Sequence, residues 1–189
     1  MSSPYSRAPE NGAPTPIYVG LDLSLSSTGI ATITSAFTTV ARVKTKPAGS
    51  SSRDKANRLD RIIGLIRAEI PRTDDTVVAV EGPAFASNDR GAHMRGGLWW
   101  MVRSMLEDDA LDVLVIPPSN VKKYATGRGN AGKDEVLAAT IRRYPDVDIT
   151  GNDEADAYVL AAMAARYTGH PIEASLPEAH LAAMKGVGR

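Results

Sequence analysis

Residues 17–34 constrain the fold most, because an acid stands inside an otherwise apolar run. The run reads IYVGLDLSLSSTGIATIT, in which two apolar stretches flank a turn of small polar residues. Apolar runs of this length, bounded by turn residues, predict a buried strand, a tight turn and a neighbouring antiparallel strand. An ionised carboxylate at Asp22 would be costly in such a strand unless a cation or hydrogen-bond donors meet it. We therefore expect a partner for Asp22 from elsewhere in the chain.

The order of the remaining apolar patterns predicts an α/β domain with a mixed central sheet. After the first three strands, apolar residues at helical spacing alternate with short, fully apolar strands. We expect three antiparallel strands to lead into parallel strands, with helices flanking the sheet. Besides the pair in residues 17–34, strands are expected at 37–43, 76–80 and 112–116, helices at 53–70, 87–106, 133–144 and 152–167, and a single helical turn at 119–124.

The chain of 189 residues suits one filled domain rather than two large ones. We expect a disordered lead-in over residues 1–16, a folded domain over 17–168, and a polar tail over 169–189 with a short helix near 177–184. There is no cysteine, no apolar signal core, and no run approaching the roughly 20 apolar residues of a membrane span. We therefore expect a cytoplasmic protein without membrane contact. The high content of Ala, Arg and Asp suits a bacterium, or a phage in its bacterial host.

Formal charges balance, with 22 basic and 22 acidic residues, so the composition carries no global signature of nucleic-acid binding. The charges are nevertheless segregated along the chain. Clusters of this kind are more often ordinary solvated faces, so they assign no partner by themselves. The first basic group contains Lys44, Lys46, Arg53, Lys55, Arg58 and Arg61, and the second contains Lys122, Lys123, Arg128 and Lys133.

Four acids occupy positions where a functional site is expected. Asp22 lies in the first strand, and Glu81 follows the strand at residues 76–80, at the end where open α/β sheets place ligands. Asp153 and Asp156 are three residues apart at the start of a helix, so they share one helical face. The pattern thus assigns one acid to a strand, one to the end of another strand and two to one helix.

Each acid also has a purely structural interpretation. Asp153 follows Thr150 at the spacing of a capping box and lies in the first helical turn, where a negative charge favours the helix dipole. Glu154 fits that role as well. Glu81 also suits the start of a surface turn, and Asp22 suits a buried structural role. Taken one at a time, the acids leave these alternatives open.

Taken together, the four acids favour a divalent metal site. Buried carboxylates that converge on one edge of a sheet repel one another unless cations lie between them. Mg²⁺ prefers oxygen ligands and keeps water and substrate phosphate in its shell. Two such ions roughly 4 Å apart would clamp a phosphodiester, one activating a water molecule and the other stabilising the leaving oxygen.

Four segments in this order resemble the RuvC-type Holliday junction resolvases of the ribonuclease H-like superfamily. The resemblance spans most of residues 17–167 and combines an Asp on the first strand, a Glu after the fourth and D-x-x-D at the start of the last long helix. It implies a ribonuclease H-like fold. The four segments read GLDLSLSSTGIA, VVAVEGPAFASN, SNVKKYATGRGNAGKDEV and NDEADAYVLAAMA.

The resemblance implies a Mg²⁺-dependent, structure-selective DNA endonuclease with two ions per active site, for which Mn²⁺ can substitute, and no small-molecule cofactor. Its partners would be branched DNA, namely a four-way junction, and a second copy of the chain. A metal-bound hydroxide would attack phosphorus in line, and the two protomers would make paired symmetric nicks that leave 5′-phosphate and 3′-hydroxyl ends. The implied catalytic residues are Asp22, Glu81, Asp153, Asp156, Lys122 and Lys133, of which the four acids bind metal, and the implied DNA-binding residues are Lys44, Lys46, Arg53, Lys55, Phe85, Asn88, Lys123 and Arg128.

Two positions depart from the family pattern. The family usually has Gly two residues after its first Asp, whereas this chain has Ser24, so the turn geometry is expected to differ. After the Glu, the family can present an aromatic wedge that enters the junction, and Ala84 stands there with Phe85 beside it. We interpret Phe85 as a substitute wedge in an exposed Gly–Pro loop, with a core position as the alternative.

The helix expected at residues 87–106 carries two adjacent tryptophans, Trp99 and Trp100. Adjacent helical positions point about 100° apart, so we expect one in the core and the other exposed or at an interface. In the resembled family a helix here forms a symmetric dimer, which implies a homodimer. A partly exposed Trp on a monomer is the alternative.

Other function classes have weaker support. The D-x-x-x-x-S-T turn after the first strand also resembles the phosphate hairpin of actin-like ATPases and sugar kinases, but no second such half follows. Another ribonuclease H-like nuclease, acting on branched DNA or RNA, is the nearest alternative, and a catalytically silent relative is disfavoured because all four acids are present. Without the resemblance, Lys122 and Lys133 suit solvated helix-end charges equally well. The three histidines share no ligand spacing, and phosphate-loop and nucleophile-elbow motifs are absent.

Overall fold

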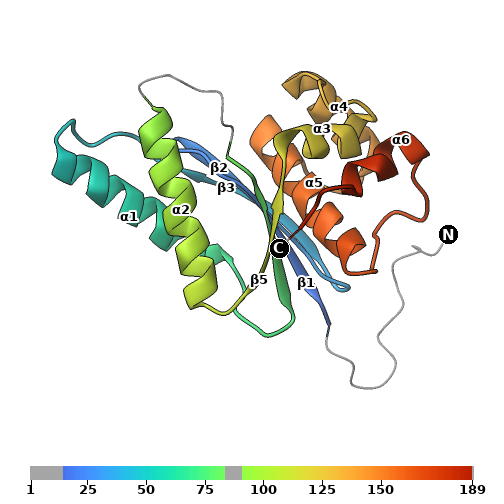
Figure 1. Ribbon diagram of the computed structural model, residues 1–189, viewed down its shortest axis with the longest axis horizontal. Coiled ribbons are helices and arrows are strands. Elements are labelled where there is room, and N and C mark those ends of the chain that lie inside the picture. Colours follow the sequence, from blue (N-terminus) through green and yellow to red (C-terminus); the bar gives the residue numbers. More distant parts are fainter. Residues whose placement is uncertain (1–14, 84–90, 189) are drawn as a thin grey trace.

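Five strands form one mixed sheet at the centre of the molecule (Figure 1). The structure is a computed structural model that describes residues 15–83 and 91–188. The strands are β1 (Ile17–Asp22), β2 (Ser27–Ile33), β3 (Thr38–Lys44), β4 (Thr76–Glu81) and β5 (Asp112–Ile116), in the sheet order β3-β2-β1-β4-β5. Pairing is antiparallel between β1 and β2 and between β2 and β3, and parallel between β1 and β4 and between β4 and β5. The predicted mixed sheet is therefore confirmed.

Helices cover both faces of this sheet in two layers (Figure 1). The layer on one face consists of α1 (Ser52–Glu69) and α2 (Ala92–Asp108). The layer on the other face consists of α3 (Pro118–Thr126), α4 (Lys133–Arg143), α5 (Asn152–Tyr167), α6 (Glu178–Leu181) and the 3₁₀ turn Ala182–Met184. This arrangement confirms the predicted α/β class with flanking helices.

Two hydrophobic cores lie one on each face of the sheet. Val19, Leu21, Val78 and Val80 pack in the core that includes α1 and α2, whereas the alternate residues Tyr18, Val77 and Ala79 belong to the core around α5. Because side chains alternate between the faces of a strand, the final residues of β1 and β4, Asp22 and Glu81, fall on the α5 face.

Helix α5 lies unusually close to the sheet because two glycines face it. A Cβ atom at Gly20 would lie 1.9 Å from the carbonyl oxygen of Ala157, and one at Gly29 would lie 1.9 Å from that of Asp153. No larger residue fits either position without moving the helix. Nearly every α5 residue from Glu154 to Ala165 is buried, and the many alanines among them allow this close approach.

Two element boundaries differ from the sequence prediction. The single turn expected at residues 119–124 is wrong, because α3 is a nine-residue helix. Pro118 suits the first turn because it has no backbone N–H, and that position of a helix has no intrahelical acceptor for one. Gly127 ends the helix with a φ of 82°. The helix expected from residue 87 is described only from Ala92, and residues 84–90 lie outside the described residues.

The segment after α5 packs on the domain rather than trailing from it. Ala183 is fully buried, and the backbone nitrogen of Val115 on β5 donates a hydrogen bond to the carbonyl of Gly188 at 3.0 Å. The sequence pattern predicted only a polar tail with a short helix, so these contacts are a finding of the structure. Among the described residues, no helix is both long enough and apolar enough to span a membrane.

Candidate active site

Asp22 and Glu81 end adjacent parallel strands and lie on the same face. The register pairs Leu21 with Val80. Asp22 and Glu81 are the next residues on the two strands, so they stand opposite each other at the end of the β1–β4 pair. Both strands end at these acids. The residue after Glu81, Gly82, donates its backbone N–H to the carbonyl of Ile116 on β5 at 2.8 Å. The carboxyl ends of two central strands therefore deliver two acids to one edge of the sheet, as the sequence predicted.

The start of α5 brings the other two acids to the same edge. Gly29 is the partner of Asp22 in the β1–β2 register, and the backbone carbonyl of Asp153 is packed against Gly29. Asp156 lies one helical turn further along, on the same helical face. The close seating of α5 on two glycines thus fixes where Asp153 and Asp156 meet the sheet.

The electrostatics show that the four acids form one cluster. Burial raises the pKa of Asp22 to about 8, helped by the negative charges of Glu81, Asp156 and Asp153. Burial, and then the charge of Asp156, raise the pKa of Glu81 to about 7. Burial also raises the pKa of Asp156 to about 6, with a further contribution from Asp153. Without a counter-charge, this cluster holds its full negative charge only at a cost.

Lys122 and Lys133 supply part of that counter-charge. Lys122 lies on α3 and Lys133 is the first residue of α4. The positive charges of both lysines lower the pKa of Glu81 and of Asp156, and Lys133 also lowers that of Asp22. The structure therefore brings both predicted lysines to the acid cluster.

Glu154, not Asp153, takes the capping role at the start of α5. Its carboxylate accepts hydrogen bonds from the backbone nitrogen of Thr150 at 2.7 Å and from the hydroxyl of Thr150 at 2.8 Å. Arg42 on β3 completes the arrangement with an ion pair to Glu154 at 2.9 Å and a hydrogen bond to Thr150 at 3.1 Å. These contacts tie the first turn of α5 to the sheet. Sequence reasoning missed Arg42, because nothing in the local pattern joins residues so far apart.

The turn after Asp22 is closed by side-chain hydrogen bonds. The hydroxyl of Thr28 donates to the carbonyl of Ser24 at 2.9 Å and accepts from the backbone nitrogen of Ser24 at 3.1 Å. Among the described non-glycine residues, a positive φ occurs only at Ala110. The turn therefore does not require glycine at the position of Ser24, which accounts for this departure from the family pattern.

Part of the first basic group lies beside that turn. Lys44 pairs with Ser27 at the start of β2, and Thr45 donates its backbone N–H to Ser26 and its hydroxyl to Leu25. Lys44 and Lys46 are exposed there, and Arg53 and Lys55 are exposed on the first turns of α1. Lys123 is half-buried, and Arg128 is engaged in an ion pair with Glu135 at 2.9 Å. The two other predicted DNA-binding residues, Phe85 and Asn88, lie outside the described residues.

Trp99 connects α2 to the site. Its indole Nε1–H donates to the backbone carbonyl of Glu81 at 2.9 Å, and its ring meets that of Trp100 edge-on at 4.8 Å between centroids. Trp99 is half-buried, whereas Trp100 is 67% exposed. The prediction that one of the pair is exposed is confirmed, and Trp99 steadies the end of β4.

The four carboxylates suit a hard divalent cation, although their side chains do not enclose one in this arrangement. Carboxylates are the ligands that Mg²⁺ prefers, and a cation would relieve the repulsion that raises three of the four pKa values. Within residues 15–83 and 91–188, no three His, Asp or Glu side chains converge tightly enough to hold one ion as they stand.

Comparison with known proteins places this arrangement in a family. The family model described as crossover junction endodeoxyribonuclease RuvC matches residues 18–164, which include most of β1, all of β4 and most of α5. The chain belongs to the RuvC family. The resemblance noted in the sequence is thereby confirmed.

Individual RuvC proteins show the same similarity. The RuvC of Zymomonas mobilis is 30% identical over 150 residues, which cover 77% of this chain and 87% of that protein. The RuvC of Rickettsia felis is 30% identical over 159 residues, covering 82% and 97%. Two structures of Thermus thermophilus RuvC, one of them in complex with Holliday junction substrate, match with TM-scores of 0.57 and 0.58 at 19% and 18% identity. Each covers 82% of this chain and 97% of the other, which confirms the ribonuclease H-like fold.

Proposed function

We propose that this RuvC-family protein is a Mg²⁺-dependent, structure-selective endonuclease that resolves four-way DNA junctions. The observation that carries the proposal is the meeting of four carboxylates from β1, β4 and α5 at one sheet edge. Two lysines from α3 and α4 reach the same edge. Relatives that cover most of the chain bear the name crossover junction endodeoxyribonuclease, which supports the reaction class.

Asp22, Glu81, Asp153 and Asp156 would hold two divalent ions, normally Mg²⁺ with Mn²⁺ as a substitute. Such ions supply a water molecule of lowered pKa and a positive charge for the leaving oxygen of a phosphodiester. The protein's own contribution is to orient the carboxylates from rigid elements, because two of them end paired strands and two share the face of one seated helix.

Lys122 and Lys133 would meet the phosphate whose bond is cut. Both are close enough to influence the acids electrostatically, so a phosphate bound between the acids would lie within reach of their ammonium groups. A positive charge placed there stabilises negative charge that develops on the phosphate oxygens. In the absence of DNA, the same charges partly offset the repulsion among the acids.

Branched DNA is the substrate that we propose. A solved relative is Thermus thermophilus RuvC in complex with Holliday junction substrate, and this supports the same class of ligand here. Exposed Lys44 and Lys46 lie beside the turn that follows Asp22, where they would contact phosphates flanking the cut. Because each such contact releases counterions, binding would weaken steeply as salt rises. The site of action would be the cytoplasm of a bacterium or of a phage-infected bacterial host.

We further propose that the protein acts as a homodimer that makes paired symmetric nicks with 5′-phosphate and 3′-hydroxyl ends. Trp100 and Met101 on α2, and Leu65 on the adjacent α1, are large apolar side chains exposed to solvent, by 67%, 37% and 39%. A two-fold dimer would cover such a surface and would carry two active sites, one for each strand.

Two alternatives make different predictions. A ribonuclease H-like nuclease with another branched substrate would share the acid cluster and differ only in what it cuts. An actin-like ATPase or kinase fragment would need a second duplicated half, and the part of the chain that the structure describes contains a single five-stranded sheet. Membership of the RuvC family favours the nuclease over the kinase.

Cleavage of a labelled four-way junction beside a linear duplex of the same sequence tests the proposal. We expect paired nicks in the junction alone, in Mg²⁺ and not in EDTA. The Asp22→Asn variant should bind the junction and fail to cut it. Cutting of flaps or RNA in preference to the junction would move the assignment to another nuclease, and nucleotide hydrolysis without any cutting would overturn it.

A further inference from the structure

The segment after α5 lies beyond the span of the family match yet is built into the fold. The family model matches residues 18–164, whereas ordered contacts continue from Ile172 to Gly188. Of these residues, Ala183 is fully buried, and Ile172, Leu176, Met184 and Val187 are partly buried against the α5 core. We refer to residues 172–188 as the C-terminal brace. Its contacts concentrate on α3, the helix that carries Lys122.

The first turn of α3 is held by Asn120. Its side-chain amide nitrogen donates to the carbonyl of Ala183 at 2.7 Å and to the carbonyl of Lys185 at 2.9 Å. Both acceptors are backbone atoms of the brace, so one side chain fastens α3 to two successive points of the C-terminal segment. Two hydrogen bonds from one amide group fix both the position and the orientation of the Asn120 side chain relative to the brace.

The other end of α3 is held by Glu173. This carboxylate, whose side chain is 6% exposed, accepts hydrogen bonds from the hydroxyl of Tyr124 at 2.9 Å and from that of Tyr144, and pairs with Arg166 at 2.8 Å. Arg166 donates to the Tyr124 hydroxyl as well, at 2.9 Å. A buried charge with this many partners is stable only in one geometry, so it fixes Tyr124 relative to α5.

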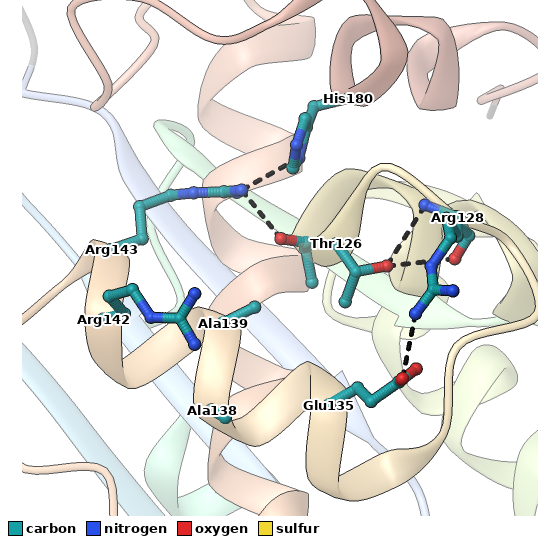
Figure 2. A pocket seen from close by; sticks show the side chains of 9 residues that line it. Thr126, Arg128, Glu135, Ala138, Ala139, Arg142, Arg143 and His180 are labelled. Carbon is teal, nitrogen blue, oxygen red and sulfur yellow. Dashed lines mark hydrogen bonds and ion pairs between the residues drawn. The ribbon is translucent and has the colours of Figure 1, made fainter.

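A second contact from the brace reaches the same end of α3, both directly and through Arg143 of α4. His180 Nδ1 lies 2.8 Å from the carbonyl oxygen of Tyr124 and 2.9 Å from Nη2 of Arg143, and Arg143 also donates to the carbonyl of Ala125 at 2.7 Å. His180 and Arg143 line an open groove of about 640 Å³ between α4 and the end of α3 (Figure 2). None of the four acids lines this groove, so it is separate from the acid cluster.

Lys122 stands between these two anchoring points, two residues after Asn120 and two before Tyr124. We propose that the C-terminal brace positions α3 so that Lys122 faces the acid cluster, and that Asn120 and Glu173 are positioning residues for cleavage. This inference rests on the proposed nuclease function and adds an element that lies outside the family match. Loosening either anchor leaves DNA contacts elsewhere intact but lets Lys122 move away from the phosphate, so the cleavage step slows more than binding does.

The variants Asn120→Ala and Glu173→Gln test the brace. Asn120→Ala removes the amide that donates to the two brace carbonyls, and Glu173→Gln removes the charge that pairs with Arg166 at nearly unchanged volume, while all four acids stay in place. We expect the single-turnover rate constant on a four-way junction to fall about tenfold in each, with junction affinity unchanged within about twofold. Amide hydrogen exchange in residues 121–126 should accelerate about tenfold, while exchange in α1 stays unchanged. Thr168→Ala is the matched control, since it removes a hydroxyl that bonds to Tyr18 at 3.2 Å, without a link to α3.

A double-mutant cycle with Lys122→Ala separates positioning from general destabilisation. If Asn120 acts through Lys122, adding Asn120→Ala to Lys122→Ala leaves the cleavage rate constant unchanged. Additive losses, or an equal loss in Thr168→Ala, would overturn the proposal. The exchange measurement tests the proposal independently of activity. If amide exchange in α3 is as slow in both anchor variants as in the wild type, the proposal is overturned. If the wild-type protein does not cut, the nuclease assignment fails, while the exchange data still show whether the brace holds α3.

Discussion

Asp22 shows how a single residue position joins stability to function. Its carboxylate ends a buried strand, and three other acids raise its pKa further. A side chain in this setting destabilises the metal-free protein whenever it is ionised, because it loses water and meets like charges that Lys133 offsets only in part. The sequence therefore retains an acid here at the expense of stability, which is typical of residues kept for chemistry.

Replacing Asp22 by Asn should stabilise the metal-free protein while abolishing cleavage. Asn keeps the shape of the side chain and removes its charge, so we expect the free energy of unfolding at pH 8 to rise by about 1–2 kcal/mol. Urea denaturation in EDTA measures this change. Added Mg²⁺ should stabilise the wild type more than the variant, and a less stable variant in EDTA would contradict the assignment.

The pH dependence of the metal-free protein follows from the same cluster. Folded-state pKa values of about 8 for Asp22 and about 7 for Glu81 lie well above the value of about 4 for these groups in an unfolded chain. Between these values the folded state binds more protons than the unfolded state, so stability falls as pH rises. Thermal unfolding in EDTA should show a lower Tm at pH 8 than at pH 6. The Asp22→Asn/Glu81→Gln double variant should show a flatter profile, and an identical slope would contradict this origin.

At the scale of elements, the seating of α5 on β1 and β2 decides the geometry of the site. The carbonyl of Asp153 occupies the space where a Cβ of residue 29 would stand, and Arg42 fastens the same turn through Glu154. The helix that carries two of the acids therefore cannot shift without breaking backbone packing. Its rigidity sets the spacing between the strand acids and the helix acids.

The Gly29→Ala variant should be destabilised by about 2–4 kcal/mol, because its methyl group would overlap the Asp153 carbonyl at 1.9 Å. Cleavage should fall as well, since α5 must move away from Asp22. The matched control is Gly64→Ala on exposed α1, where nothing lies within 4 Å of an added Cβ. That change should stabilise by about 0.5–1 kcal/mol, as expected for alanine in a helix. Chemical denaturation compares the two, and equal effects would contradict the packing argument.

Sequence reasoning predicted the strands, the long helices and the meeting of the four acids, because strand ends and helix faces follow from periodicity. It did not predict Arg42, whose partner Glu154 is more than a hundred positions away and is chosen by the β3–α5 packing. It also missed the nine-residue length of α3 and the ordered C-terminal brace. Those contacts depend on backbone carbonyls and a buried carboxylate at Glu173, for which the local sequence pattern carries no signal.

At the scale of the whole molecule, both helical layers expose large apolar side chains. Trp100 and Met101 lie on α2, and Leu181 lies on the opposite layer at the end of α6, 38% exposed. We expect the α2 surface to be the one that a second copy covers, because Trp100 alone is 67% exposed and the adjacent helix α1 also exposes Leu65.

The Trp100→Lys variant should therefore convert a dimer into a monomer, since it places a charge in an apolar interface. Sedimentation equilibrium measures the association, and we expect at least a tenfold weaker dimer. Leu181→Lys is the matched control and should leave association unchanged. A wild-type monomer at micromolar concentration, or a dimer insensitive to Trp100→Lys, would contradict this interface.

The central claim is that four acids act together as one metal-dependent nuclease site. The most direct measurement is the single-turnover cleavage rate of a four-way junction by the wild type and by Asp22→Asn, Glu81→Gln, Asp153→Asn and Asp156→Asn, each at saturating Mg²⁺. We predict a loss of at least a hundredfold in each variant, with junction binding retained and no cutting by any protein in EDTA. Wild-type activity in any one of the four variants, or cutting in EDTA, would contradict the claim.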